Sequence, residues 1–452
     1  MAGSRRSPQA DVDGARVLLR AVDRALSLHL EPGARVVVAL SGGRDSVALL
    51  DAAAASKRIR REDLVAVHVH HGLSPHAQRW AEFCARLATS MQVTFDLRRV
   101  NAAVRSREGV ESRARSLRYA ALRDAAHEHC ASTVLLAHHQ DDQAETVLLQ
   151  LLRGAGVHGL AAMPEVRTVD GITWLRPMLR VTREQVDAYV RSRDLAYVDD
   201  ESNASTRHRR NALRHRVLPS LRELAGGFPA TLARAATHQA EAAQLIDELA
   251  TLDIAPLLDS ESLDRKGLAA LPPHRARNVL RHFLRLHGLR PPSTARLAAM
   301  HDQLTVSRGD ASVRLTHDGR TLGIHRGRIV VHRVPPVAYA RAWRGESSLD
   351  LPHGRLDFVP TRDRGLCVAH RDAGWTVRPR AGGERFQPFA TRPRRALKSW
   401  LQEASVPSWE REALPLVFHG EDLVAVPGFG VDVAYQAKGG EAGLALVWRP
   451  FP

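Results

Sequence analysis

The sequence has few cysteines and no long apolar run. Its three cysteines, Cys84, Cys130 and Cys367, are far apart and form no C-x-x-C pair, which argues against a disulfide framework and against a zinc or iron–sulfur site. No stretch approaches the roughly 18 consecutive apolar residues of a membrane span. The start, Met1 to Ala10, contains two arginines without a following apolar segment, so we interpret it as a frayed terminus and not as an export signal. These absences predict a cytoplasmic protein.

Acidic residues are also scarce relative to basic ones. Lys and Arg number 65 against 49 Asp and Glu, which gives a net charge of +16 over 452 residues. The excess is mainly arginine, whose guanidinium binds phosphate through two hydrogen bonds, so it favours a polyanionic partner. A generally basic proteome would produce the same excess, and charge alone leaves both interpretations open. The length predicts two to four domains.

The first informative motif lacks a lysine. Ser41-Gly42-Gly43-Arg44-Asp45-Ser46 follows the strand-like run 36–40 and precedes an Ala- and Leu-rich helical stretch. Two glycines at a strand-to-helix turn let backbone N–H groups approach phosphate oxygens, and the helix N-terminus adds partial positive charge. No G-x-x-x-x-G-K-[ST] is present. The loop therefore suits pyrophosphate as a leaving group, with chemistry at the α-phosphorus; an ordinary Gly-rich turn is the alternative.

Asp45 places an anion inside this predicted phosphate loop. A Mg²⁺ ion between Asp45 and the phosphates of ATP would relieve the repulsion. A helix-capping role for the Asp45 carboxylate is the alternative, and both roles can coexist. Ser41 and Ser46 can donate their hydroxyls to phosphate oxygens, or Ser46 can act as a simple cap.

Strand and helix patterns alternate through roughly the first 200 residues. This alternation predicts βαβ units and an α/β fold with a doubly wound parallel sheet. Ligands bind such sheets at the carboxyl ends of the strands, where the 41–46 loop, 68–72 and 138–142 all fall. The predicted strands are Arg35–Leu40, Leu64–His70, Val93–Arg98 and Thr133–Ala137, and the predicted helices are Val47–Ser56, Ala77–Ser90, Glu111–Cys130 and Gln140–Arg153.

A second motif, Leu135 to Thr146, brings two histidines and two carboxylates to the same edge. Asp142 and Glu145 are three residues apart, so on a helix they share one face. Two carboxylates beside a nucleotide site suit an ammonium-bearing substrate or a metal. A helix whose first turn is rich in acids would explain the carboxylates, but not the adjacent pair His138 and His139.

Two other clusters are less specific. His68, His70 and His71 resemble a metal cluster, but no fourth ligand is evident, so structural roles are favoured over a zinc site. Arg115 and Arg118 lie three apart on a predicted helix and can both face the site, or form a solvated face. The basic run 209–216 matches a phosphate-contact strip or an ordinary solvated segment.

The chain divides by composition into segments. We expect a catalytic domain over 1–225, a mainly helical middle domain over 226–335, a linker over 336–365 and a small α+β C-terminal domain over 366–452. The glycines and proline at 226–229 mark the first boundary.

Together these motifs resemble the N-type ATP pyrophosphatases and, within that superfamily, the tRNA(Ile)-lysidine synthase family. The resemblance covers about 35–221 and 376–430. It rests on the six-residue loop and on several further motifs in the family's order: His71-Gly72-Leu73, Leu136–Thr146, Arg153–Gly156, Arg176–Leu179, Asp200–Asn203, Arg210–Arg214, Arg378–Phe386 and Leu397–Glu403.

The resemblance implies a two-step ligase reaction on the wobble cytidine of a tRNA(Ile) with a CAU anticodon. The C2 oxygen attacks the α-phosphorus of ATP, and the side-chain amine of L-lysine then displaces AMP. ATP and Mg²⁺ are implied, and the oligomeric state stays open, with a homodimer as one option.

The resemblance also implies roles for individual residues. Ser41, Gly42, Gly43, Arg44, Asp45 and Ser46 would bind ATP, with Asp45 also holding Mg²⁺. Asp45, His138 and Arg118 would act in adenylation, and Asp142 and Glu145 would bind lysine. The tRNA-binding residues would be Arg210, Asn211, Arg214, Arg378, Arg380, Arg385, Arg394, Arg395 and Lys398.

Three rival functions are weaker. A tRNA thiolase of the same superfamily typically needs paired cysteines, which this chain lacks. A glutamine-dependent ligase would need an amidotransferase segment, and none is visible. A non-catalytic RNA-binding relative would be expected to lose Asp45, Asp142 or Glu145, yet all three are present.

Overall fold

The computed structural model describes residues 8–72, 74–101, 110–199, 209–306, 313–333, 338–369 and 374–451. It divides into two compact units, 1–245 and 246–452, and the division falls inside the long helix α10 (Phe228–Ile254). Each unit is considered by itself. The predicted motif residues Leu73 and 200–203 lie outside the described residues.

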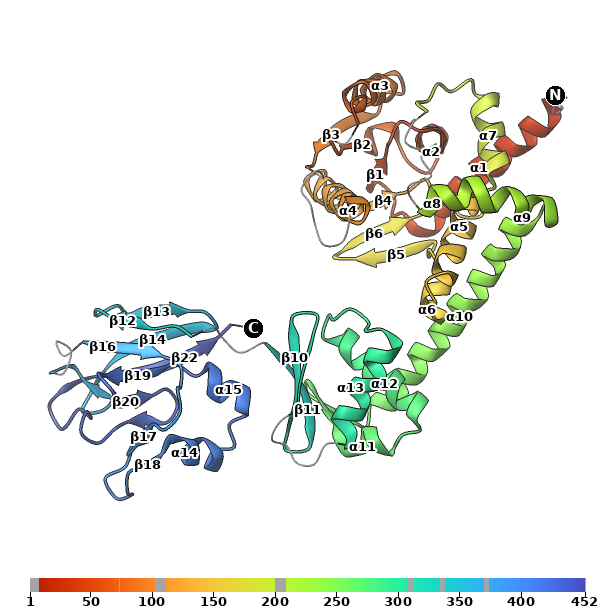
Figure 1. The fold of residues 1–452 in the computed structure, drawn as a ribbon. Coiled ribbons are helices and arrows are strands. Elements are labelled where there is room, and N and C mark those ends of the chain that lie inside the picture. Colours follow the sequence, from red (N-terminus) through yellow and green to blue (C-terminus); the bar gives the residue numbers. More distant parts are fainter. Residues whose placement is uncertain are drawn as a thin grey trace. The chain divides into compact units, whose positions relative to one another are not determined.

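The first unit is built on a six-stranded sheet in the order β3-β2-β1-β4-β6-β5 (Figure 1). Every neighbouring pair is parallel except β5–β6, which confirms the expected α/β fold with a doubly wound parallel sheet. The strands are β1 (Arg35–Ala39), β2 (Leu64–His70), β3 (Thr94–Arg99), β4 (Ala131–Leu135), β5 (Val166–Val169) and β6 (Ile172–Leu175).

Helices cover both faces of this sheet because the strand side chains alternate in direction. Val36 and Val38 of β1 belong to one buried cluster, with residues of α1, α2, α3 and α7. Val37 and Ala39 belong to another, with residues of α4. The helices are α1 (Pro8–His29), α2 (Arg44–Ala55), α3 (Ala77–Ser90), α4 (Val110–Glu128), α5 (Gln140–Leu151), α6 (Val157–Leu160) and α7 (Arg183–Ser192), with a 3₁₀ turn η1 (Arg61–Asp63).

The structure differs from the expectation in two places. The hairpin β5–β6 was not predicted; its strands are only four residues long, and three of the four residues of β5 are exposed. Helix α1 already begins at Pro8, within the segment 1–10 interpreted as frayed. Buried Leu18 and Val22 tie α1 to the core, and this packing is a tertiary effect that the terminal residues do not reveal.

A basic helical segment follows the sheet and packs against α5. It comprises α8 (Arg209–Ala212), the π-helical turn η3 (Leu213–Val217) and α9 (Leu218–Leu224). Leu213 and Leu218 are buried with Ala144 of α5 and with Phe228 of α10. This small apolar cluster holds the arginines of the segment beside the first turns of α5.

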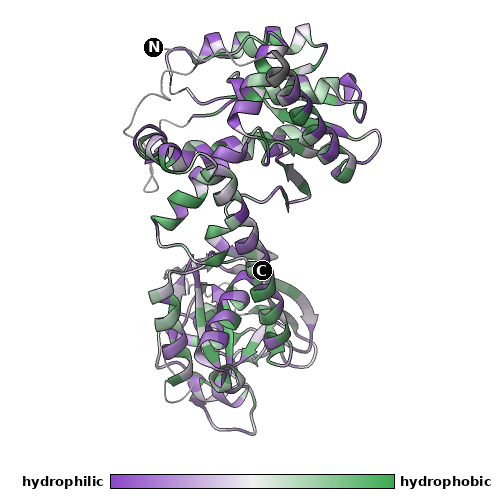
Figure 2. Ribbon diagram, turned by 90° about the vertical axis from the view of Figure 1, so that its right-hand side faces the viewer, coloured by the Kyte–Doolittle hydropathy of each residue, from purple (hydrophilic) through white to green (hydrophobic). Residues whose placement is uncertain are grey.

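The second unit begins with helices on a small sheet. The end of α10, α11 (Arg265–Ala270), α12 (Pro273–Leu286) and α13 (Thr294–Val306) enclose an apolar core with a five-stranded sheet in the order β7-β8-β11-β10-β9. Its strands are β7 (Leu258–Asp259), β8 (Ser262–Asp264), β9 (Arg314–His317), β10 (Arg320–His325) and β11 (Arg328–Arg333). Figure 2 shows both hydropathy colours along most helices, as expected for helices with one buried side.

The C-terminal part of the second unit consists mainly of antiparallel strands. Its two larger sheets run β12-β16-β19-β20-β21 and β13-β14-β22-β15. Strands β12, β13 and β14 fall within 336–365, where we expected a linker. The elements are β12 (Arg341–Trp343), β13 (Ser348–Leu351), β14 (Gly354–Arg362), β15 (Leu366–Cys367), β16 (Trp375–Arg378), β17 (Arg385–Phe386), β18 (Arg395–Ala396), α14 (Leu397–Glu403), α15 (Ser408–Ala413), β19 (Leu416–His419), β20 (Asp422–Val426), β21 (Gly430–Val431) and β22 (Ala442–Pro450).

Candidate active site

The predicted phosphate loop lies between β1 and α2. Gly42 has φ +87°, a left-handed conformation that side chains disfavour, and a Cβ atom there would lie 3.0 Å from the Cys84 sulfur. Gly43 precedes α2 in an extended conformation, so the first N–H groups of the helix have no main-chain acceptor within it. The loop therefore has the backbone that an anion-binding turn requires.

Serine hydroxyls close the loop on itself. Ser46 Oγ donates to the Gly43 carbonyl at 2.8 Å and accepts from the Ser41 N–H at 3.1 Å. The two hydroxyl oxygens are 3.0 Å apart, and Ser46 is buried. In this structure Ser46 shapes the loop from inside, while Ser41 lies on its rim.

Arg44 links Asp45 to α7. The Arg44 guanidinium pairs with Asp187 of α7 at 2.6 Å and with the Asp45 carboxylate at 3.3 Å. The Asp45 side chain keeps 34% of its surface exposed. Asp45 is thus the open carboxylate of the loop, whereas Arg44 is engaged toward α7.

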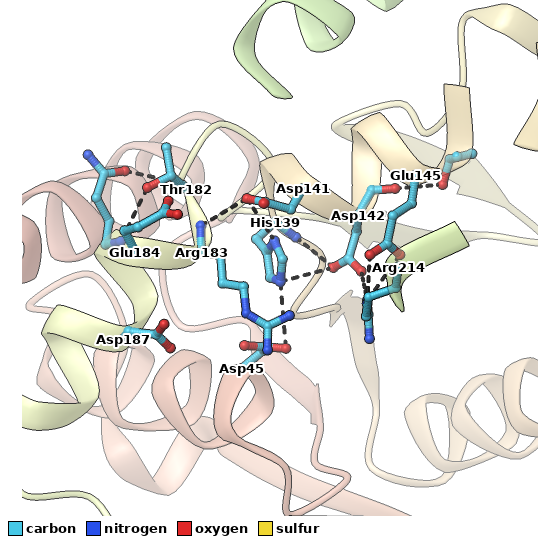
Figure 3. A network of polar contacts seen from close by, with 12 residues as sticks. Asp45, His139, Asp141, Asp142, Glu145, Thr182, Arg183, Glu184, Asp187 and Arg214 are labelled. Carbon is cyan, nitrogen blue, oxygen red and sulfur yellow. Dashed lines mark hydrogen bonds and ion pairs between the residues drawn. The ribbon is translucent and has the colours of Figure 1, made fainter. Parts of the chain in front are cut away.

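His139, which the sequence placed at this edge without a role of its own, lies between the phosphate loop and the Asp142–Glu145 pair (Figure 3). Its Nε2 atom is 3.7 Å from the Asp45 carboxylate and 3.5 Å from the Asp142 carboxylate, and the residue is 1% exposed. Its backbone N–H donates to Asp142 at 3.1 Å. The one available signal was its place directly before α5, next to His138.

Asp142 and Glu145 face the same partners from one side of α5, as their spacing predicted. Arg210 donates to Glu145 at 2.8 Å and to Asp142 at 2.9 Å. Arg214 donates to both Glu145 oxygens, at 2.7 and 3.0 Å. The two carboxylates and two guanidinium groups form a buried network in which Glu145 is 1% exposed. Asn211 lies between these arginines on α8.

The network sets the charge states of its members. Burial by itself raises the pKa of Asp142, but the electrostatic influence of His139 and of the Arg210 guanidinium outweighs it and holds that pKa below its ordinary value. Burial lowers the pKa of Arg214, yet its hydrogen bonds to Glu145 more than restore it, so the net shift is upward. Asp142 is therefore a carboxylate and Arg214 a cation at neutral pH.

His138 occupies an enclosed position on the other side of the α5 start. Burial holds its pKa well below the ordinary value, because Asp142 offsets only part of the desolvation and Arg118 repels a proton. Its buried Nδ1 atom has no hydrogen-bond partner among the described residues. His138 is thus a neutral imidazole with an unused nitrogen near Arg118 of α4. Arg115, by contrast, is exposed.

Asp141 anchors the segment that carries these groups. Its carboxylate accepts from Arg222 of α9 at 2.7 Å and from the Arg183 backbone N–H at the start of α7 at 3.0 Å. Asp141 thereby fixes α5 against two elements that are distant in sequence.

The histidines near β2 have a structural place. His68 is buried, and its Nδ1 atom lies 2.9 Å from the Leu40 carbonyl. Within the described part of the chain, no group of three potential ligands is arranged to hold a metal ion.

The other predicted tRNA-binding residues lie in the second unit, and most are paired there. Arg378 lies 3.8 Å from the centre of the Phe418 ring, and Arg394 pairs with fully buried Asp432 at 2.7 Å. Lys398 and Arg385 are exposed without an ion pair in the described ranges. Arg380 pairs with Glu384, Arg385 donates to the Arg394 carbonyl, and Arg395 pairs with Glu403.

Comparisons with known proteins agree with this architecture. Residues 18–221 match the PP-loop domain family, 263–330 the TilS substrate binding domain and 375–448 the TilS substrate C-terminal domain. A tRNA(Ile)-lysidine synthase of Nitrosomonas europaea is 39% identical over 94% of both chains. One of Ralstonia nicotianae is 42% identical over 92% of both, and one of Chromobacterium violaceum is 40% identical over 91% of this chain and 95% of its own.

None of the helices in the described ranges combines the length and the apolar character needed to cross a membrane.

Proposed function

This chain belongs to the tRNA(Ile)-lysidine synthase family. We propose that its phosphate loop (41–46) and its acidic pocket (Asp142 and Glu145) together carry out the family's two reaction steps. The protein is an ATP-dependent tRNA-modifying ligase that forms lysidine at the wobble cytidine of tRNA(Ile). The observation that carries the assignment is His139, which lies within 3.7 Å of Asp45 and 3.5 Å of Asp142. It joins a phosphate loop and an acidic pocket into one site.

The phosphate loop supports the adenylation step. The C2 oxygen of the cytidine attacks the α-phosphorus, and the bond to pyrophosphate breaks. The glycines at 42 and 43 and the start of α2 offer N–H groups to the departing pyrophosphate. The cytidine has to leave its base stack to reach the loop.

Asp45 suits a magnesium ion that is held jointly by the protein and by the phosphates of ATP. Mg²⁺ usually takes one or two carboxylates and completes its coordination with substrate phosphates. Asp45 supplies one partly exposed carboxylate at the loop. When bound, the ion would neutralise phosphate charge.

The acidic pocket supports the second step. The lysine side-chain amine forms a bond to C2, and AMP leaves with the former C2 oxygen. Asp142 and Glu145 are the carboxylates that would receive the ammonium group, and the amine has to lose a proton before attack, since its ordinary pKa is about 10.4. Neutral His138 and the cation Arg118 would act on the adenylate side of the site.

The thiolase alternative finds no support in the cysteines. Cys84 and Cys367 are buried and lie in different units, and only Cys130 is exposed. Burial raises the pKa of the Cys84 thiol to about 12, which keeps it unreactive at neutral pH.

The test is a reaction of purified protein with ATP, labelled lysine and tRNA(Ile) carrying either a CAU or a GAU anticodon. We expect label in the CAU tRNA alone, together with release of pyrophosphate and AMP. Label in neither tRNA would overturn the proposal, and label in both would overturn the anticodon specificity. Asp45→Asn is expected to abolish pyrophosphate release while keeping tRNA binding; exposed Asp124→Asn serves as the matched control.

A further inference from the structure

The two carboxylates proposed to receive the lysine amine already accept hydrogen bonds from two arginines and a main-chain N–H. Both oxygens of Glu145 accept from guanidinium groups, at 2.7, 2.8 and 3.0 Å. Asp142 uses one oxygen for Arg210 at 2.9 Å and the other for the His139 N–H at 3.1 Å. Glu145 is also 1% exposed, so an incoming ammonium group reaches it only if an arginine moves aside.

The arginines that occupy the pocket belong to a segment with a second, outward face. Arg210 and Arg214 are four residues apart and point to α5, whereas Arg209 and Arg216 on the same segment are exposed. A polyanion that approaches the outer face meets a dense group of positive charges. Arg210 and Arg214 are the nearest further groups that could donate hydrogen bonds to its phosphates.

The backbone of this segment is irregular and not one continuous α-helix. Leu213–Val217 forms a π-helical turn between two short α-helices. π-helical turns are rare and are frequently found at functional sites. The segment is held by the apolar contacts of Leu213 and Leu218 and by Arg210 and Arg214. At its far end Arg222 of α9 also pairs with Asp141 of α5, so α9 stays anchored when Arg214 is released.

We propose that Arg210 and Arg214 close the amine pocket in the RNA-free protein and that tRNA phosphates open it by drawing the Arg214 guanidinium away from Glu145. This inference rests on the proposed function and adds to it an order of binding, in which tRNA prepares the site for lysine. The amine gains its binding carboxylates only when RNA is present, so lysine binding and tRNA binding strengthen each other.

Charge balance explains why the exchange is possible. A buried carboxylate is costly without a cation, so neither arginine can leave unless another cation replaces it. Lysine supplies that cation, and a phosphate supplies a new partner for the departing guanidinium. One ammonium replaces one guanidinium: Arg214 leaves, while Arg210 stays beside Asp142 and Glu145, so every charge is paired before and after the exchange. With lysine alone, the released Arg214 would lack a partner.

Equilibrium dialysis of labelled lysine, with ATP omitted so that no reaction occurs, tests the inference. For the wild-type protein we expect lysine to bind at least about tenfold more tightly when tRNA(Ile) with the CAU anticodon is saturating. Arg214→Gln is expected to bind lysine more tightly than wild type without RNA and to show little further gain with it. Arg209→Gln is the matched control: it is expected to weaken tRNA binding but to keep the effect of tRNA on lysine affinity.

Two results would overturn the inference: an unchanged lysine affinity of wild type with and without tRNA, or an undiminished RNA effect in Arg214→Gln. Thermal melting shows whether Arg214→Gln is folded. If it is not, Arg214→Lys decides, since it keeps a charge beside Glu145 but loses the paired hydrogen bonds. A smaller RNA effect than in wild type is then expected, and an equal one overturns the inference. A wild-type protein that forms lysidine but binds lysine independently of RNA refutes only this inference, whereas a protein that forms no lysidine refutes the proposed function.

Discussion

His138 shows how a single residue acquires its properties from its surroundings. A histidine ordinarily titrates near 6.5, but burial and the field of Arg118 hold the pKa of this one well below that value. Asp142, nearby, is held in its ionised form. At neutral pH the site thus contains a neutral imidazole beside a carboxylate. Such an imidazole can take part in hydrogen bonds but does not carry an extra proton.

This difference in pKa makes stability depend on pH. The unfolded chain takes up a proton at His138 as the pH falls through about 6.5, and the folded chain does not, so the free energy of unfolding decreases below that pH. We expect His138→Gln to lose less stability than wild type between pH 6.5 and about 5. Urea unfolding at a series of pH values measures the effect. Parallel curves for the two proteins would contradict it.

At the scale of secondary-structure elements, the loop between β1 and α2 is the most constrained connection of the site. Gly42 combines a left-handed backbone with close contact to Cys84. Because the turn aims the N-terminus of α2, a change at Gly42 should disturb nucleotide binding as well as folding.

We expect Gly42→Ala to lower the free energy of unfolding by about 1–3 kcal/mol and to weaken ATP binding at least severalfold. Gly33→Ala is the matched control, since Gly33 has a similar φ of +76° but open space around it. Denaturant titration and nucleotide binding should separate the two variants. Equal behaviour would mean that backbone strain alone, without the Cys84 contact, determines the effect.

At the scale of the whole molecule, the +16 net charge has two uses. Many arginines are committed to internal ion pairs, such as Arg394 with buried Asp432. Other basic residues, such as Lys398, are exposed without an ion pair in the described ranges. Only the second group can serve RNA without a cost in stability.

Two substitutions in the second unit should separate these uses. Lys398→Ala is expected to leave the melting temperature unchanged, weaken tRNA binding and lower the salt dependence of binding by about one unit of log–log slope. Arg394→Ala is expected to lower the free energy of unfolding by about 2 kcal/mol, because it leaves Asp432 buried without its cation. Filter binding over a salt series and thermal melting provide the measurements. A stability loss in Lys398→Ala would refute the division.

The sequence by itself determined the parallel sheet, the phosphate loop and the shared face of Asp142 and Glu145. Each of these depends on short-range periodicity or on the special backbone of glycine, which neighbouring residues reveal. The short hairpin β5–β6 and the start of α1 were not accessible in this way, since their stability comes from packing against residues far along the chain.

Only the tertiary structure decided how the site is connected. Arg210 and Arg214 lie more than sixty residues from Glu145, and their basic run predicted contact with RNA, not with carboxylates. His139 reaches Asp45 only because β1 and β4 are neighbours in the sheet. Ion pairing depends on distance in space and on burial, and neither is encoded in the local pattern around these residues.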